Sequence, residues 1–234
     1  MKDRCYLLSL EEFFEGEDGK QLLKASFDKV DEGRREKAKR LKAGRAQAAC
    51  VGAGLLLQFT VQESLKPHAD LREDSDEPVL YSVSQILKLL KEPLPIDIDY
   101  GEKGKPYLRE YPFFFNLSHS GTYAVCAVSD REVGVDIQQC TLADIDRLAA
   151  RFFSEREYSA MQECATEEGK RRLFFRLWTR KEAYGKLLGA GVWETVGRNM
   201  LPDDPESDRP LHFLEWDRPA GYRIAVCQYE CEGH

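Results

Sequence analysis

Three strand-like runs follow one another closely in the middle of the chain, and they constrain the fold most strongly. Residues 113–121, 122–130 and 132–138 (FFFNLSHSG, TYAVCAVSD and EVGVDIQ) are rich in apolar, aromatic and β-branched residues. The first two meet near Gly121, and the tight turn 129–132 joins the second and third. This succession predicts short antiparallel strands that follow one another along the chain.

Segments with helical apolar spacing lie on both sides of these runs. Helices are predicted over 20–41, 45–62, 79–92, 141–153, 154–164 and 170–189, and further strands over 5–10, 95–100, 211–217 and 222–230. Each half of the chain therefore combines helices with a small sheet, which predicts an α+β fold.

Composition excludes several classes of protein. With 234 residues, of which 42% are hydrophobic and 32% charged, the chain is neither wholly disordered nor collagen-like. No apolar window approaches the roughly 18 residues of a membrane-spanning helix, and the start of the chain does not resemble a signal peptide. The seven cysteines form no CxxC pair and only four histidines are present, so we expect no zinc site and a reduced, cytoplasmic protein.

Charge is distributed unevenly along the chain. The net charge of −7 argues against general binding to nucleic acid, and we expect no contact with a membrane. Residues 34–45 (RREKAKRLKAGR) nevertheless hold seven basic residues and one acidic residue, while 70–77 and 203–208 are acidic. The basic strip is either a site for an anionic ligand or a solvated helix face, and the strip alone favours neither.

Two predicted elements carry side chains suited to a divalent cation. Asp136 and Gln138 are two positions apart on a predicted strand and share one face, while Trp178, Glu182 and Lys186 are spaced by four on a predicted helix. Asp136 and Glu182 together could hold magnesium, with Lys186 reaching a phosphate bound to it. Taken singly, Asp136 is more often a turn or salt-bridge residue, and Glu182 with Lys186 a surface ion pair.

A bend of small residues offers donors for an anion. His119 lies between Ser118 and Ser120, just before Gly121, so backbone N–H groups, hydroxyls and an imidazole are adjacent. The alternative is a histidine at a strand end with no ligand. Lys105 lies in a GKP turn, which by itself indicates a lysine that faces solvent. The chain contains neither a Walker loop nor a Rossmann fingerprint.

Taken together, these motifs resemble one family in their order and spacing. GKPYL, FNLSHSG, VGVDIQ, RFFSEREY and WTRKEAYGK are similar to motifs of the 4′-phosphopantetheinyl transferases of the surfactin-synthetase-activating (Sfp-like) class, over about residues 34–191. The resemblance implies two pseudo-symmetric lobes, placed at 1–120 and 121–234, with coenzyme A between them and the metal site in the second. It also implies that a carrier-protein serine attacks the β-phosphate of coenzyme A, receives 4′-phosphopantetheine and displaces 3′,5′-ADP.

The resemblance assigns residues to the metal and to catalysis. Asp136 and Glu182 match the metal carboxylates, and Lys186 matches the lysine that contacts the pyrophosphate. Gln138 stands where many members have glutamate, so it supplies a carbonyl oxygen or leaves the place to water, and weaker magnesium binding is expected. Glu157 matches a glutamate proposed to help deprotonate the serine, and either Glu157 or Glu182 is the expected general base.

The resemblance also assigns contacts to coenzyme A. Ser118 and His119 match phosphate contacts, Lys105 and Pro106 match the turn beside the adenine, and Arg45 matches an arginine for the 3′-phosphate. The expected cofactor is magnesium, the expected partner is an acyl or peptidyl carrier protein of unspecified pathway, and the expected state is a monomer. Two alternatives stay open: a metal-dependent phosphodiesterase or pyrophosphatase acting on a nucleotide, and a non-catalytic binder of coenzyme A.

Overall fold

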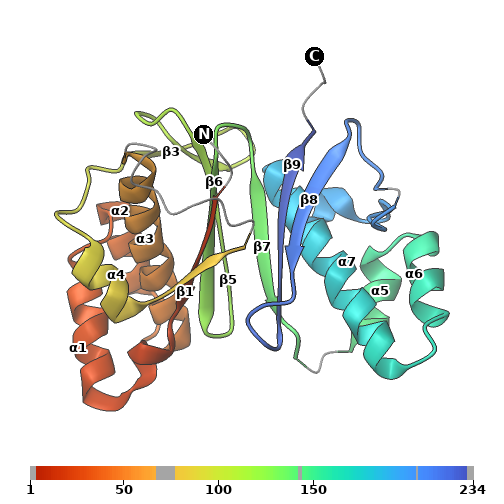
Figure 1. Cartoon of the computed structure of the whole chain (residues 1–234), viewed down its shortest axis with the longest axis horizontal. Helices are drawn as coiled ribbons and strands as arrows, with labels where there is room; N and C mark the ends of the chain where they lie inside the picture. Colours follow the sequence, from red (N-terminus) through yellow and green to blue (C-terminus); the bar gives the residue numbers. More distant parts are fainter. Residues whose placement is uncertain (1–3, 67–76, 142–143, 204, 231–234) are drawn as a thin grey trace. The chain divides into compact units, whose positions relative to one another are not determined.

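The structure is a computed structural model that describes residues 4–66, 77–141, 144–203 and 205–230. Most of the acidic loop 70–77 and Cys231 therefore lie outside the described residues. The chain divides into two compact units (Figure 1): unit 1 is Met1–Asp99 with Pro106–Asp130, and unit 2 is Tyr100–Lys105 with Arg131–His234. The sequence-based boundary at 120–121 falls instead in the turn between two strands that pair with each other.

Unit 1 contains a four-stranded sheet in the order β2-β1-β6-β5. Its strands are β1 (Arg4–Ser9), β2 (Val79–Ser82), β5 (Phe114–Ser120) and β6 (Tyr123–Ser129). β1 runs parallel to β2 and antiparallel to β6, and β5 and β6 form the predicted antiparallel pair. A separate two-stranded ladder joins β3 (Ile98–Tyr100) and β4 (Pro106–Leu108).

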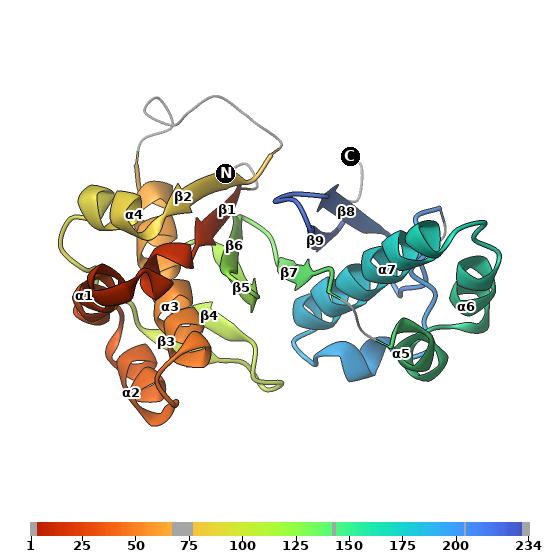
Figure 2. The ribbon, with the colours of Figure 1, turned by 90° about the horizontal axis from the view of Figure 1, so that it is seen from below.

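The core of unit 1 forms where α3 packs on this sheet. α3 (Arg45–Ser64) is buried from Ala48 to Val61 and contacts β1, β5 and β6, while α1 (Gly16–Phe27), α2 (Glu32–Arg40) and α4 (Val83–Leu89) pack around it (Figure 2). The prediction of one buried helix over 45–62 is therefore confirmed. The basic strip lies on α2 and at the start of α3, where Arg45 is exposed.

Two predicted helices of unit 1 are wrong in their extent. The segment 79–92 begins as a strand, because Val79–Ser82 pairs with β1, and the helix starts only after Ser82, whose side chain forms a capping box with Gln85. The segment 20–41 is interrupted, because Asp31 accepts a hydrogen bond from the Arg34 N–H and starts a second helix.

Unit 2 packs α7 (Glu167–Leu187) on a three-stranded antiparallel sheet in the order β7-β9-β8. The strands are β7 (Gly134–Gln139), β8 (Leu211–Trp216) and β9 (Tyr222–Tyr229). Gly134 allows this close approach, because a Cβ there would overlap the Ala183 carbonyl oxygen and the Leu187 backbone. The helices α5 (Ile145–Phe152) and α6 (Glu155–Gln162) complete the core against α7.

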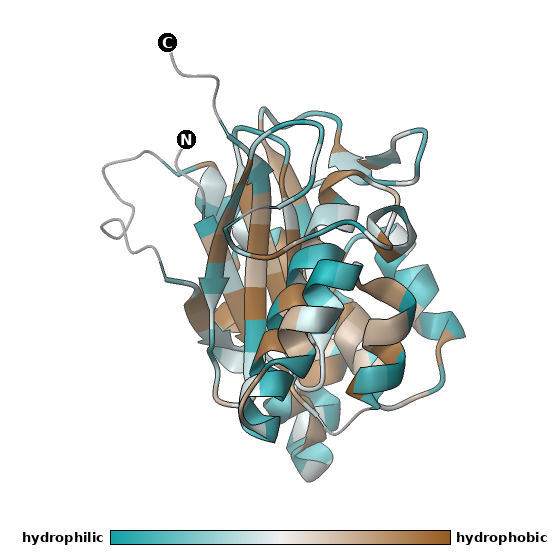
Figure 3. Cartoon of the chain, turned by 90° about the vertical axis from the view of Figure 1, so that its right-hand side faces the viewer, coloured by the Kyte–Doolittle hydropathy of each residue, from teal (hydrophilic) through white to brown (hydrophobic). Residues whose placement is uncertain are grey.

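The hydropathy of the elements agrees with this packing. In Figure 3 the strands are mostly hydrophobic, whereas the helices alternate hydrophilic and hydrophobic residues, as helices with one buried face do. Within the part of the chain that the structure describes, no helix combines the length and apolar character needed to cross a membrane. The molecule is an α+β protein, as predicted.

Candidate functional site

The β7 strand places a buried carboxylate beneath α7. Asp136 is 2% exposed, between the fully buried Val135 and Ile137, whose side chains point to the other face of the strand. A carboxylate this deeply buried requires charged or hydrogen-bonding partners, since desolvation disfavours the ionised form.

Each carboxylate oxygen of Asp136 has such a partner. The Lys186 Nζ lies 2.6 Å from Oδ1, and the Gln138 Nε2 donates to Oδ2 at 2.7 Å. The predicted shared face of Asp136 and Gln138 is therefore confirmed, and α7 delivers Lys186 to the same place. Gln138 faces Asp136 with its amide nitrogen, so in this structure it supports the carboxylate as a donor.

Glu182 brings a second carboxylate to Asp136 and Lys186. It lies one helical turn before Lys186 on α7, so the two side chains share a face. Burial first, and then the negative charge of Asp136, raise the pKa of Glu182 to about 7, while Lys186 opposes that rise. The two carboxylates thus interact electrostatically within a single charge cluster.

The chemistry of this cluster suits a hard divalent cation. Two carboxylates and one ammonium leave an excess negative charge in a desolvated place, and carboxylate oxygens are the ligands that magnesium prefers. Among the described residues, no three side chains of histidine, cysteine, aspartate or glutamate gather to hold a metal. A cation here would therefore need oxygens from water or a phosphate ligand as well, which is how magnesium is commonly held.

Glu157, one of the two predicted candidates for the general base, lies in the interior of unit 2. Its side chain is 0% exposed and forms an ion pair of 2.9 Å with Lys181, which is also 0% exposed. Its oxygens accept hydrogen bonds from the backbone N–H groups of Ser154 and Met200, at 2.7 and 2.8 Å. In this structure both oxygens of Glu157 are therefore occupied by protein donors.

Lys181 is a buried charged residue that the sequence analysis did not predict. Its ammonium also donates to the carbonyl oxygens of Thr195 and Arg198. A signal was present, since Lys181 lies four positions after Leu177 and three before Tyr184, both fully buried. That spacing places the lysine on the core-facing stripe of the helix.

Lys105 does not face solvent. Its ammonium donates to the carbonyl oxygen of Leu187, the last residue of α7, at 2.8 Å, and lies 3.9 Å from Glu132. Burial lowers the pKa of Lys105, and Glu132 opposes that shift. The GKP turn thus caps the carboxyl end of the helix that carries Glu182 and Lys186.

The remaining predicted contacts lie in unit 1. Ser118 is buried and His119 exposed on β5, and Pro106 begins β4. Arg45 begins α3, with its guanidinium carbon 5.6 Å from the centre of the Phe14 ring. The ten predicted site residues are thus divided between the two units, six in unit 2 and four in unit 1.

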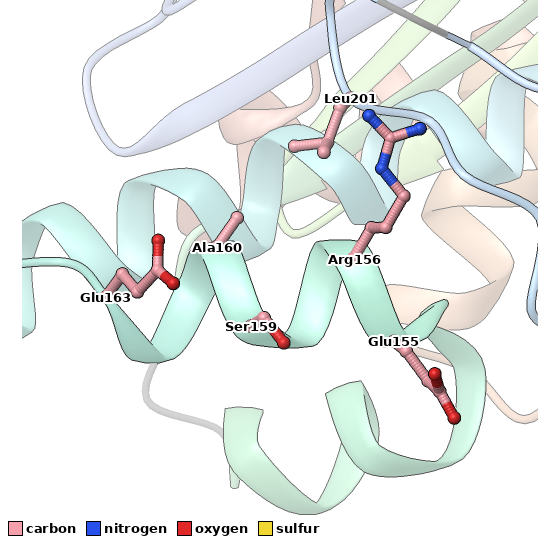
Figure 4. Close-up of a pocket in the computed structure, with 6 residues that line it drawn as sticks. All are labelled: Glu155, Arg156, Ser159, Ala160, Glu163 and Leu201. Atoms are coloured by element: carbon pink, nitrogen blue, oxygen red, sulfur yellow. The ribbon is translucent and has the colours of Figure 1, made fainter.

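A surface depression elsewhere on unit 2 contains none of these residues. It measures about 410 Å³ and opens along α6 (Figure 4). It is lined by Glu155, Arg156, Ser159, Ala160, Glu163 and Leu201.

A family model matches the segment that holds the charge cluster. Residues 132–227 match the model of the 4′-phosphopantetheinyl transferase superfamily. Over 122 residues the chain is 39% identical to the 4′-phosphopantetheinyl transferase HetI of Nostoc sp., a match that covers 49% of this chain and 51% of that protein.

Two relatives from Bacillus subtilis give similar results. A 4′-phosphopantetheinyl transferase of that species is 35% identical over 145 residues, which covers 57% of this chain and 64% of the relative. The 4′-phosphopantetheinyl transferase Sfp of strain 168 is 31% identical over 136 residues, a match that covers 54% of this chain and 60% of Sfp. The chain thus spans between about half and two thirds of these relatives. The matches confirm the resemblance that the motifs predicted.

Proposed function

We propose, from the premise that residues 132–227 belong to the 4′-phosphopantetheinyl transferase superfamily, that this chain modifies carrier proteins. It transfers 4′-phosphopantetheine from coenzyme A to a serine of an apo acyl or peptidyl carrier protein and releases 3′,5′-ADP. The relatives' names support the type of transfer. Magnesium and the carrier protein are parts of the same proposal.

The cluster of Asp136, Glu182 and Lys186 carries this proposal. Two carboxylates from different elements interact in one desolvated place, with a lysine 2.6 Å from one of them. The cluster lies inside the segment that matches the superfamily. A diphosphate substrate is negatively charged, so a cluster with two carboxylates can bind it only together with a cation.

The residues have distinct proposed tasks. Asp136 and Glu182 would hold magnesium with support from Gln138, and the bound ion would supply charge neutralisation on the diphosphate. Lys186 would contact a phosphate oxygen and stabilise the charge that develops as the bond to 3′,5′-ADP breaks. The serine proton would go to Glu182, because Glu157 is fully buried. Coenzyme A would be bound by Arg45, Lys105, Pro106, Ser118 and His119.

The decisive experiment is a mass measurement on carrier proteins. The chain is incubated with coenzyme A, magnesium and a panel of apo carriers from fatty-acid, polyketide and nonribosomal peptide systems. We expect one phosphopantetheine adduct on a carrier serine and an equal amount of 3′,5′-ADP. Omission of magnesium should abolish the adduct.

Two results would contradict the proposal. Release of 3′,5′-ADP without any carrier would indicate hydrolysis with water as the nucleophile. Coenzyme A binding without adduct on any carrier, and with no effect of magnesium, would indicate a binding protein.

A further inference from the structure

The ion pair between Glu157 and Lys181 connects three segments in the interior of unit 2. Glu157 belongs to the first turn of α6 and Lys181 to the middle of α7. The ammonium of Lys181 donates to Thr195 O and Arg198 O, and Glu157 accepts from the Met200 N–H. The pair therefore fastens α6 and the segment 195–200 to α7.

The pair is fully surrounded by protein partners. Both side chains are 0% exposed, and their charges lie 2.9 Å apart. Glu157 also closes the capping box of α6, accepting from the N–H and hydroxyl of Ser154. Removing one partner of such a buried pair leaves a charge without its counter-charge, which strongly destabilises the arrangement that encloses it.

Lys181 is the direct neighbour of Glu182. Successive helical residues point about 100° apart, so the face that turns Lys181 inward determines where Glu182 points. Lys186, one turn after Glu182, extends from the same side to Asp136. A rotation of α7 that released Lys181 would also move Glu182 and Lys186, the two side chains that α7 contributes to the charge cluster.

We propose that Glu157 and Lys181 are positioning residues that set the rotation of α7 and thereby hold Glu182 and Lys186 beside Asp136. They act through the helix and do not touch substrate. The expected effect on the rate of carrier modification rests on the proposed function. The claim that the pair fixes the rotation of α7 rests only on the contacts described above.

The test compares single variants with a neutral double variant. Glu157→Gln and Lys181→Gln each leave one buried charge unpaired, whereas the double variant carries two amides that can hydrogen-bond to each other. The control is Lys170→Gln, also on α7, which breaks an ion pair at the surface, where the Lys170 side chain is 13% exposed and its partner Asp146 52% exposed. Tm, amide hydrogen exchange of residues 195–200, and the initial rate of carrier modification are measured for each.

We expect each single variant to lower Tm by about 10 °C or more and to speed amide exchange at residues 195–200. The control should lower Tm by less than about 3 °C. The double variant should recover most of the lost Tm and return the rate to within about tenfold of the unmodified chain. Such recovery supports positioning, because a residue that accepts the serine proton cannot be replaced in this way.

Two results would overturn the proposal. A folded double variant whose rate stays about 10²–10⁴-fold low would identify Glu157 as the general base. Single variants with Tm and exchange equal to those of the control would show that the pair fixes nothing. If the unmodified chain modifies no carrier, the proposed function fails, yet Tm and exchange still decide whether the pair fastens α7.

Discussion

Lys186 on α7 and Asp136 on β7 form an ion pair of 2.6 Å between positions separated by 50 residues. The aspartate side chain is 3% exposed and the lysine side chain 26%, so the pair has a buried end and an accessible end. The accessible end is the lysine, which is the group proposed to contact a phosphate. The carboxylate is fixed before any ligand arrives, and such fixed charges need little reorganisation during a reaction.

Asp136→Asn should weaken the use of magnesium. The amide keeps the shape of the side chain but removes one of two carboxylates, so the magnesium concentration for half-maximal rate should rise by at least about tenfold. The measurement is the initial rate of carrier modification over a magnesium titration. Asp208→Asn is the control, since its side chain is 90% exposed. Equal titrations of the two variants would refute the metal assignment.

Lys105→Met should destabilise the carboxyl end of α7. The variant loses a charged hydrogen bond to the Leu187 carbonyl and leaves that oxygen without its donor, at a cost of about 1–3 kcal/mol. Thermal unfolding measures the effect, and Lys103→Met, exposed in the same turn, should leave Tm nearly unchanged. Equal Tm values for the two variants would show that the contact contributes nothing.

The same variant separates two roles of Lys105. If the lysine acts only as a helix cap, stabilising α7 by other means should restore coenzyme A binding in Lys105→Met. If it also contacts coenzyme A, calorimetry should show a raised Kd even at temperatures where the variant is fully folded.

Glu215→Gln should remove stability in a pH-dependent way. Burial raises the pKa of Glu215, but hydrogen bonds and charges from Arg176, Arg180 and Arg223 outweigh it and lower the pKa below its ordinary value. A carboxyl with a lowered pKa stabilises the fold above its unfolded pKa, and that contribution is lost as pH falls through the folded pKa. The variant should therefore lower Tm clearly at pH 7 and much less near pH 3.5.

The comparison for Glu215 is thermal unfolding from pH 7 to pH 3.5. Glu194→Gln is the matched control, since Glu194 is exposed in the same unit. A Tm difference between Glu215→Gln and the unmodified chain that stays constant across this range would show that the three arginines do not lower the pKa.

Local signals predicted most of the elements that carry the site. The alternation around Asp136 and the spacing of Glu182 and Lys186 depend on residues within a few positions of each other. The structure confirms both, because side-chain periodicity is set within one strand or one helical turn.

Contacts between distant segments account for what the sequence did not predict. Val79–Ser82 becomes a strand because β1, about 70 positions earlier, offers it a partner. Lys105 is drawn inward by a carbonyl 82 positions later in the chain. Glu157 closes the capping box of its own helix, but the partner of its buried charge is Lys181 from another helix, which no local pattern predicts.

Gly134→Ala should separate α7 from β7. The new methyl group would lie 2.5 Å from the Leu187 nitrogen and would overlap the Ala183 carbonyl oxygen. Both are backbone atoms inside a helix, so they have little freedom to move. We expect a loss of about 1–3 kcal/mol in the free energy of unfolding, and a larger relative loss in transfer rate, because Lys186 and Glu182 lie on the displaced turns.

Gly33→Ala on α2 is the control, where the methyl group would meet only Asp31 Oδ1 at 3.4 Å and should be neutral or slightly stabilising. Denaturant unfolding measures the stability of both variants, and the carrier assay measures their transfer rates. If Gly134→Ala is as stable and as active as Gly33→Ala, the close contact between α7 and β7 does not hold the charge cluster together.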